Sequence, residues 1–235
     1  MSSSSNTNSI VNVQWLLQNL NNVKVIDASY IPTATRNFEE FQTKYILWPK
    51  VAAFTAEHIP GAVHFGLDTA YFPSKFIKFD LYPPEIFQKY IRLLGVNNDD
   101  HVVIYSRGPA AGMMFASRAY WTFKDGKWGR EELIQCNNFL FSEATGSHVT
   151  GAISFPMANV IGSGGFISKE DVDSQIAKLG VTSGDQVYVA CNTGIQASVI
   201  FVALERSGVK AKLYNGSMTE LAYRAPELVN ATGSV

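Results

Sequence analysis

The fold is decided by the stretch Asp185-Gln-Val-Tyr-Val-Ala-Cys-Asn-Thr-Gly-Ile-Gln-Ala197. Its first part, up to Ala190, is an apolar run with β-branched residues, which is typical of a buried strand. A short polar segment with one glycine follows. The apolar sequence from Ala197 to about Ser207 then predicts a helix. A strand, a tight loop and a helix in this order are the building unit of a parallel α/β sheet.

The same unit occurs twice in the chain. Leu94-Gly-Val-Asn-Asn-Asp-Asp-His-Val-Val-Ile104 resembles Leu179-Gly-Val-Thr-Ser-Gly-Asp-Gln-Val-Tyr-Val189, and His58-Ile-Pro-Gly-Ala-Val63 resembles His148-Val-Thr-Gly-Ala-Ile153. We therefore predict an α/β fold with two similar domains, each a parallel sheet flanked by helices. In such sheets ligands bind beyond the carboxyl ends of the strands.

The length of 235 residues suits two small domains, which we place at residues 8–125 (domain one) and 126–235 (domain two). Other segments also carry the periodicity or the capping residues of helices and strands. They predict helices at Val13–Leu20, from Pro84 to the stop at Gly95, from the end of the loop Ser106–Ala111 to about Phe123, from Ser168 to Lys178 and after Ser217. They also predict strands at Val23–Asp27, His101–Tyr105 and Ala211–Tyr214.

Composition limits the classes of partner. The 19 basic and 20 acidic residues form no long run of one sign, so neither nucleic acid nor a membrane is expected as a partner. A small molecule is expected instead. Two cysteines, Cys136 and Cys191, are too few for a disulfide framework, and free thiols persist in reducing compartments. The first residues lack the features of a signal or transit peptide, so we expect a cytoplasmic protein, with the mitochondrion as the alternative.

Cys191 opens the segment Cys191–Ala197, called here the cysteine loop. Backbone amides of a short glycine-containing loop can curl around an anion, and the following helix points its positive end at the same place. Both effects stabilise a thiolate, and thiols so placed have pKa values lowered from about 8.5 to roughly 3.5–7.5. The alternative is that Cys191 is a small buried hydrophobic residue.

Two motifs strengthen the first interpretation. Phe54-Thr-Ala-Glu-His-Ile-Pro-Gly-Ala-Val-His-Phe65 and Leu213-Tyr-Asn-Gly-Ser-Met-Thr-Glu220 are similar to the N-terminal and C-terminal signatures of the tandem rhodanese-type family, which contains thiosulfate and 3-mercaptopyruvate sulfurtransferases. Met218 stands where that family usually has tryptophan. The resemblance spans roughly residues 10 to 228 and implies two rhodanese-like domains, with the catalytic cysteine in domain two alone.

The resemblance implies a sulfurtransferase. Cys191 would take the outer sulfur of 3-mercaptopyruvate or thiosulfate as a persulfide and pass it to a thiol or cyanide, with a thioredoxin-like reductant as a further partner and without cofactor or metal. Thr193 would donate its hydroxyl to the donor, or else cap local backbone. The neutral loop favours mercaptopyruvate-like donors. The residues implied to surround the donor and the persulfide are Asn192, Thr193, Gly194, Ile195, Gln196 and Ala197.

Ser106 stands in domain one where domain two has its cysteine, so only domain two carries the nucleophile. Three features depart from the family pattern. A family histidine has no counterpart in Phe79-Asp-Leu-Tyr-Pro83. The junction between the domains is short, and its segment Glu131–Cys136 offers one strand where the family has two. The stretch Cys136–Phe141 lacks the arginines that hold the donor, for which Arg36 and Arg107 are the available substitutes. The alternative function is a rhodanese-like binding or scaffold protein with little or no turnover.

Other classes are disfavoured by single residues. A cysteine phosphatase needs an arginine six positions after its cysteine, where this chain has Ala197. No histidine is placed to activate the thiol of a papain-like protease. His58 and His148 precede the same turn in both repeats, which favours structural hydrogen bonds over acid-base or metal roles. Cys136 lies outside any motif and is expected to be a bystander.

Overall fold

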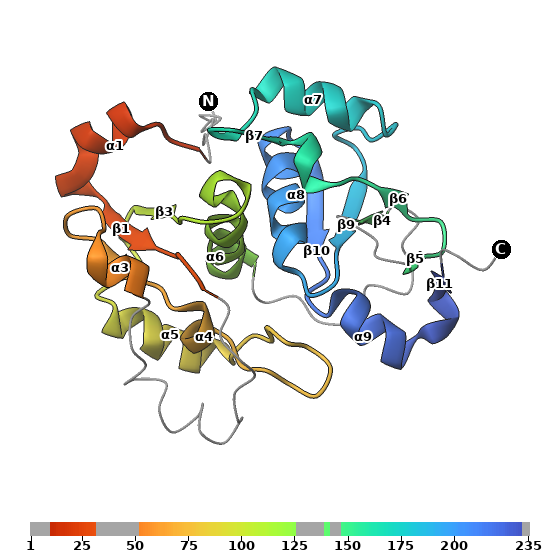
Figure 1. Ribbon diagram of the computed structural model, residues 1–235, viewed down its shortest axis with the longest axis horizontal. Coiled ribbons are helices and arrows are strands. Elements are labelled where there is room, and N and C mark those ends of the chain that lie inside the picture. Colours follow the sequence, from red (N-terminus) through yellow and green to blue (C-terminus); the bar gives the residue numbers. More distant parts are fainter. Residues whose placement is uncertain (1–9, 32–51, 126–138, 142–146, 232–235) are drawn as a thin grey trace, which may run out of the picture.

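The structure is a computed structural model, and it shows two α/β units side by side (Figure 1). Between them, helices α6 (Met113–Asp125) and α8 (Ile195–Arg206) pack against each other. The residues that the structure describes are 10–31, 52–125, 139–141 and 147–231.

The sheet of domain one is parallel. Strand β1 (Lys24–Asp27) lies between β2 (Val63–His64) and β3 (Val102–Tyr105) among the described residues. Asp27 pairs with His64 on one side and with Tyr105 on the other, so the carboxyl ends of the strands meet at one edge. Besides α6, the described residues of this domain form the helical segments α1 (Val13–Asn19), η1 (Leu20–Asn22), α3 (Ala52–Ala56), α4 (Leu67–Ala70), α5 (Pro84–Leu93) and η3 (Ala110–Gly112).

The sheet of domain two repeats this order and extends it. Its described strands run β10-β9-β4-β6, all in parallel pairs. The part β6-β4-β9 corresponds to β2-β1-β3 of domain one. The strands are β4 (Phe139–Phe141), β6 (Ile153–Ser154), β9 (Gln186–Ala190) and β10 (Lys210–Leu213). The predicted α/β fold with two similar domains is thus confirmed, whereas their boundary at residue 125 stays a prediction.

Several short elements of domain two have no counterpart in the sequence predictions. Two antiparallel pairs, β5 with β11 and β7 with β8, consist of strands of two or three residues, too short to show a period of two. The bounds of the unpredicted elements are β5 (Ser147–Val149), η5 (Met157–Asn159), β7 (Ile161–Gly162), β8 (Gly165–Phe166), η6 (Pro226–Leu228) and β11 (Val229–Ala231). The helices α7 (Lys169–Ala177) and α9 (Ser217–Arg224) lie where helices were predicted.

The sequence repeat has a matching backbone turn in each domain. Gly61 and Gly151 both adopt φ of +77°, a conformation that favours glycine. The amide of the next residue, Ala62 or Ala152, donates to the carbonyl three positions earlier, at 2.9 and 3.0 Å. The two copies therefore share the local geometry that leads into β2 and β6, as the repeated motif predicts.

The predicted elements that fall on described residues are present, most of them with an end shifted by one or two residues. Helix α8 begins at Ile195, two residues before the predicted start at Ala197, because Gly194 adopts φ of +81° and ends the loop there. Strand β4 was not predicted, and the predicted strand Glu131–Cys136 lies outside the described residues.

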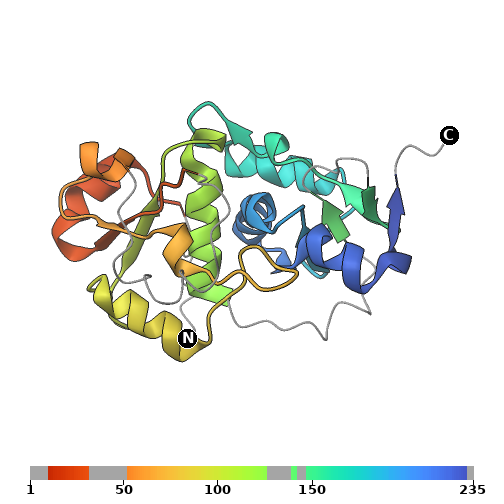
Figure 2. The same cartoon turned by 60° about the horizontal axis from the view of Figure 1, so that its bottom comes forward.

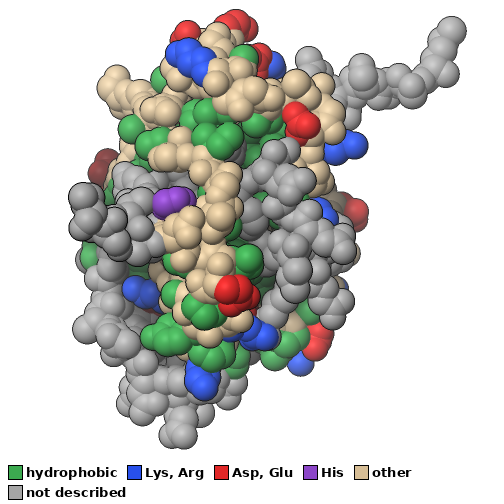
Figure 3. All heavy atoms as spheres, turned by 90° about the vertical axis from the view of Figure 1, so that its right-hand side faces the viewer, with side chains coloured by type: hydrophobic (Ala, Val, Ile, Leu, Met, Phe, Trp, Pro, Cys, Tyr) green, Lys and Arg blue, Asp and Glu red, His purple; other side chains and the backbone are tan. Residues whose placement is uncertain are grey.

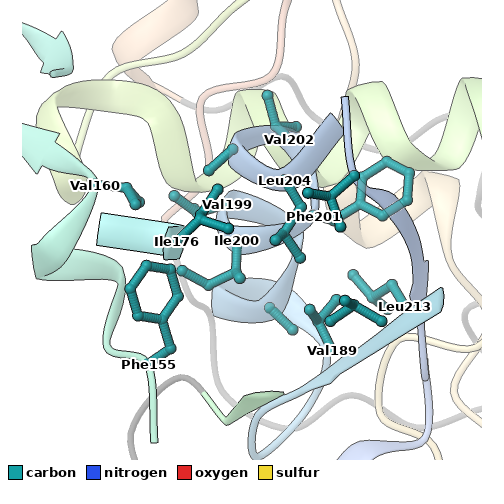
Figure 4. Close-up of a cluster of buried hydrophobic side chains, with 14 of the residues drawn as sticks. Phe155, Val160, Ile176, Val189, Val199, Ile200, Phe201, Val202, Leu204 and Leu213 are labelled. Atoms are coloured by element: carbon teal, nitrogen blue, oxygen red, sulfur yellow. The ribbon is translucent and has the colours of Figure 1, made fainter. Parts of the chain in front are cut away.

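The largest hydrophobic core surrounds α8 (Figure 4). A helix that is apolar on all sides must be enclosed by other elements, and α8 buries side chains around its whole circumference. Ile200 and Leu204 are almost fully buried, and Phe155 and Val189 pack against them from the surrounding chain. This packing fixes the axis of α8 and hence the position of its first residue.

The two domains share their cores. Ile195, the first residue of α8 in domain two, belongs to the buried cluster of domain one with Phe115 and Ala119 of α6. Conversely, Trp121 of α6 belongs to the cluster around α8. Domain one therefore reaches the start of α8 directly.

The face of domain two carries charged side chains of both signs (Figure 3). On the face that Figure 3 shows, Lys and Arg side chains and Asp and Glu side chains are scattered among hydrophobic and neutral ones. Among the described residues, helices that combine the length and the hydrophobicity needed to cross a membrane are absent.

Candidate active site

Cys191 lies where strand β9 ends and the path to α8 begins. Its side chain is 1% exposed. The backbone N–H of Gly194 donates a hydrogen bond to its Sγ at 3.1 Å. Gly194 is also the residue that precedes the first turn of α8, so the sulfur lies at the positive end of this long helix. One backbone amide of the predicted loop, that of Gly194, thus donates to the sulfur as expected.

A second segment holds the backbone of Cys191. The N–H of Cys191 donates to the Oγ of Ser217 at 3.2 Å, and the N–H of Met218 donates to the carbonyl of Cys191 at 2.9 Å. Ser217 is fully buried, adopts φ of +49° and donates its own hydroxyl to the Tyr214 carbonyl at 2.8 Å. The start of α9 therefore forms hydrogen bonds with both the N–H and the carbonyl of Cys191.

The next residue of the loop is held by the same segment. The carbonyl of Asn192 accepts from both the N–H and the hydroxyl of Thr219, at 3.1 and 2.7 Å. Sequence reasoning identified this segment only as part of a signature. Its contact with the cysteine loop was missed, because the two segments are far apart in the chain.

Glu220 of α9 packs against the segment that holds the cysteine loop. Its carboxylate is 1% exposed, accepts from the Tyr214 hydroxyl at 2.7 Å and forms an ion pair with Arg224 at 3.5 Å. A Cβ atom on Gly216 would overlap the carboxyl group of Glu220. The glycine of the Gly216-Ser217 pair is therefore required by close packing.

Domain one contributes a buried arginine. Arg118 of α6 is 0% exposed, and its guanidinium donates to the carbonyl of Gly194 at 3.2 Å and to the Oδ1 of Asn215 at 2.6 Å. It also donates to the Phe79 carbonyl at 2.9 Å and to the Tyr71 hydroxyl at 3.2 Å. Sequence reasoning missed this residue entirely. The only available signal was a charged residue inside an apolar helix.

The predicted loop residues divide into two groups. Asn192 is exposed, and Thr193 is half-buried with a hydroxyl that has no hydrogen-bond partner among the described residues. Ile195 and Ala197 are buried in the hydrophobic cores, while Gln196 is half-buried. Of these loop residues, Gly194 contacts the sulfur, whereas the contact of any loop residue with a donor stays a prediction.

Domain one has a polar cluster at the corresponding strand ends. Arg107 forms an ion pair with Asp27 at 3.4 Å and donates to the Glu57 carbonyl at 2.7 Å. Burial raises the pKa of Tyr105 to about 12. Ser106, which replaces the cysteine, accepts from the Ala116 amide at 3.1 Å. Arg107 is therefore engaged within its own domain, and Arg36, the other suggested substitute, lies outside the described residues.

The histidines do not converge on the sulfur. The Nδ1 of His58 is 2.9 Å from the Phe54 carbonyl, and the two rings are stacked at 4.2 Å. The structural role predicted for His58 is thus confirmed. His148 lies in β5, and Cys136 lies outside the described residues. Within the described part of the chain, no group of three or more His, Cys, Asp or Glu residues is arranged to hold a metal ion.

Comparisons with known proteins identify relatives of this chain. Residues 12–131 match the family model "Rhodanese-like domain". The chain is 40% identical over 238 residues to mpst-4 of Caenorhabditis elegans, provisionally named a thiosulfate sulfurtransferase, covering 94% of this chain and 86% of that protein. It is 24% identical to the 3-mercaptopyruvate sulfurtransferase of Escherichia coli strain K12, covering 72% and 81%.

Solved structures show the same two-domain fold. The crystal structure of SseA from Escherichia coli, a 3-mercaptopyruvate sulfotransferase, superimposes with a TM-score of 0.69 at 21% identity, covering 90% of this chain and 99% of SseA. Tum1 from Saccharomyces cerevisiae gives a TM-score of 0.70 at 16% identity, covering 93% and 96%. Together with the family match and the 40% identity, this fold shows that the chain belongs to the rhodanese family, among its tandem-domain sulfurtransferases.

Proposed function

We propose that this protein transfers a sulfane sulfur from 3-mercaptopyruvate or thiosulfate to a thiol or cyanide through a persulfide on Cys191. The observation that supports it most is the hydrogen bond from the Gly194 amide to the sulfur at the start of α8. An amide donor and a helix N-terminus both favour the anionic sulfur that this chemistry needs.

In the first half-reaction, the thiolate of Cys191 attacks the outer sulfur of thiosulfate or the thiol sulfur of 3-mercaptopyruvate. With thiosulfate, the S–S bond of the donor breaks and sulfite leaves with the bonding electrons. With 3-mercaptopyruvate, the C–S bond breaks and the enolate of pyruvate leaves and takes up a proton. In both cases a covalent persulfide stays on the cysteine, which splits the transfer into two steps.

In the second half-reaction, an acceptor attacks the outer sulfur of the persulfide. The S–S bond breaks, the electron pair returns to the sulfur of Cys191, and the acceptor leaves as thiocyanate or as its own persulfide. A dithiol of the thioredoxin type can then form a disulfide and release sulfide. Such an acceptor requires a reducing compartment, which fits the cytoplasm or the mitochondrion.

The donor preference follows from the loop. Asn192 and Thr193 are neutral, and the half-buried Thr193 hydroxyl has no partner among the described residues. A hydroxyl can donate to a carbonyl or carboxylate oxygen but adds no charge for a dianion. We therefore expect 3-mercaptopyruvate to be the better donor.

One observation favours a second candidate, a rhodanese-like binding protein without turnover. Cys191 is only 1% exposed, so a donor reaches the sulfur only if the surrounding side chains admit it. This candidate predicts a folded protein that binds a partner but whose cysteine takes no sulfur from small donors.

Steady-state turnover decides between the two candidates. Thiocyanate formation from each donor with cyanide, and sulfide release with a dithiol, are measured for the wild type, Cys191→Ser and Cys136→Ser. The proposal expects Cys191→Ser to lose all turnover and Cys136→Ser to keep it. A folded wild type without turnover from either donor would favour the binding protein, and turnover retained in Cys191→Ser would exclude the persulfide route.

A further inference from the structure

Arg118 is a cation from domain one that is built into the cysteine loop of domain two. Its guanidinium spans three segments, since it contacts Gly194 and Asn215 of domain two and Phe79 of domain one. Asn215 completes the bridge, because its side-chain amide donates to the same Phe79 carbonyl at 3.0 Å. In Figure 2 the chain between α4 and α5, which carries Phe79, extends from domain one towards α8 and α9.

The guanidinium is buried, and no charged side chain among the described residues pairs with it. Its hydrogen bonds to described residues all end on neutral oxygens, and two aromatic rings, Tyr71 and Trp121, lie 4.7 and 4.5 Å from it. A buried charge is costly unless an opposite charge or several hydrogen bonds compensate it. Here the hydrogen bonds are present, but the positive charge itself is not neutralised within the described structure.

The sulfur of Cys191 lies on the other side of a single residue. Gly194 donates its N–H to the sulfur at 3.1 Å and accepts the guanidinium on its carbonyl at 3.2 Å. A Cβ atom on Gly194 would lie 3.0 Å from the Nη1 of Arg118 and 2.9 Å from the Asn215 carbonyl, so the three groups are in close contact. The guanidinium thus lies one residue away from the sulfur, and it holds the carbonyl of the residue whose amide binds that sulfur.

We propose that Arg118 is a positioning residue of the sulfur site, which holds the Gly194 amide against the sulfur and supplies the positive charge that an anionic thiolate or persulfide requires. This inference deepens the proposed function and rests on it only for the sulfur-loading measurement. It assigns domain one a part in the reaction, although that domain has Ser106 instead of a cysteine.

Other charged groups near the loop do not replace this cation. Glu220 of α9 is negative and already paired with Arg224 and Tyr214. Lys78 and Asp80 flank Phe79 and are more exposed to water than Arg118, which screens their charges. Of these charged groups, Arg118 is the fully buried cation, so its charge is screened least by water.

The main test compares Arg118→Met with Arg206→Met. Arg206 lies at the opposite end of α8 and donates to the Ile167 carbonyl at 3.0 Å, so its loss removes a charge and a hydrogen bond far from the sulfur. The rate of Cys191 alkylation by iodoacetamide is followed by peptide mass spectrometry between about pH 5 and 10. We expect the profile of Arg118→Met to move by about one unit to higher pH, and that of Arg206→Met to match the wild type.

Two further variants cover the case in which Arg118→Met does not fold. Arg118→Lys keeps the charge but loses the planar fork, so its pH profile stays near that of the wild type while its rate of sulfur loading falls about tenfold. Asn215→Asp places a carboxylate of the same shape against the guanidinium and neutralises it, which moves the profile to higher pH.

The outcomes separate this inference from the proposed function. A wild type that takes sulfur from neither donor, together with a shifted profile in Arg118→Met or Asn215→Asp, refutes the transfer reaction and supports the role of Arg118. Unchanged profiles in Arg118→Met and Asn215→Asp overturn that role. An equal shift in Arg206→Met also overturns it, because the effect would then be one of general stability.

Discussion

The hydroxyl of Ser217 accepts the backbone N–H of Cys191 at 3.2 Å in a fully buried contact. Ser217 itself adopts φ of +49°, a conformation that costs a non-glycine residue roughly 1–3 kcal/mol and persists only where the surroundings impose it. The C-terminal signature segment is thus held in an unfavourable conformation in order to keep the cysteine backbone in place.

Replacing Ser217 by alanine should destabilise the site. The Cys191 N–H would lose its partner, and a buried unsatisfied group costs about 1–3 kcal/mol, while the Tyr214 carbonyl would keep only the Ser217 backbone N–H at 3.2 Å. We expect a loss of this size in the free energy of unfolding, measured by urea titration, together with slower sulfur loading. Ser198→Ala, which removes an equally buried hydroxyl that bonds only within α8, should lower stability less and keep the loading rate. Equal loading rates in all three proteins would contradict the role of Ser217.

Gly194 is required for two separable reasons, and Gly208 provides the comparison. Both glycines have positive φ, +81° and +77°, but an added Cβ meets neighbours only at Gly194. Gly194→Ala and Gly208→Ala should therefore each lose about 1 kcal/mol from backbone strain, measured by chemical unfolding. Only Gly194→Ala should also lose sulfur loading, by at least about tenfold, which corresponds to roughly 1.4 kcal/mol. Normal loading in Gly194→Ala would show that the tight contact has no functional role.

Asp185 predicts a dependence of stability on pH. Hydrogen bonds from the amide and the hydroxyl of Thr182 hold the pKa of its carboxyl below the ordinary value of 3.8. A depressed pKa in the folded state means that the stabilisation is present above pH 3.8 and is lost as the pH falls through the lowered value. Asp185→Asn should therefore lower the unfolding free energy at neutral pH, with a difference from the wild type that shrinks in acid.

Asp99→Asn is the control for this measurement, because the Asp99 side chain is exposed and has no hydrogen bond to the described residues. Its unfolding free energy should follow that of the wild type at every pH. A difference between Asp185→Asn and the wild type that grows towards acid would reverse the predicted sign.

Phe155 tests whether the core around α8 supports the site from a distance. Its side chain is 1% exposed and packs in the cluster around α8, so Phe155→Ala should cost about 3–5 kcal/mol of stability. Below the melting temperature, sulfur loading should remain, because the loop contacts are unchanged. Ile153→Ala removes a side chain that is 42% exposed and should cost far less. Similar losses in both variants would show that this core is loosely packed.

Much of the fold could be predicted from the sequence because its signals are local. The turn at Gly61 and Gly151 and the strand, loop and helix around Cys191 are each encoded within a few residues, and both appear in the structure. Strand β4 was missed because it has three residues and depends on its neighbours β6 and β9 for its existence.

Only the part of the candidate site that is contiguous with Cys191 in the sequence could be predicted. The loop residues follow Cys191 directly in the chain, whereas Arg118 reaches Gly194 across 76 positions. An arginine within Phe115-Ala-Ser-Arg-Ala-Tyr-Trp121 carries no mark that separates a buried bridge from a solvated side chain. The start of α9 was recognised by its signature, but its hydrogen bonds to Cys191 and Asn192 depend on the tertiary structure.

The central claim is that Cys191 carries the transferred sulfur. It is tested most directly by incubating the protein with 3-mercaptopyruvate or thiosulfate, capping the thiols, and locating added sulfur by peptide mass spectrometry. We predict one extra sulfur atom on the peptide of Cys191, none on that of Cys136, and its removal by cyanide with an equal amount of thiocyanate. Absence of added sulfur on Cys191 with both donors, or its presence on Cys136 alone, would contradict the account.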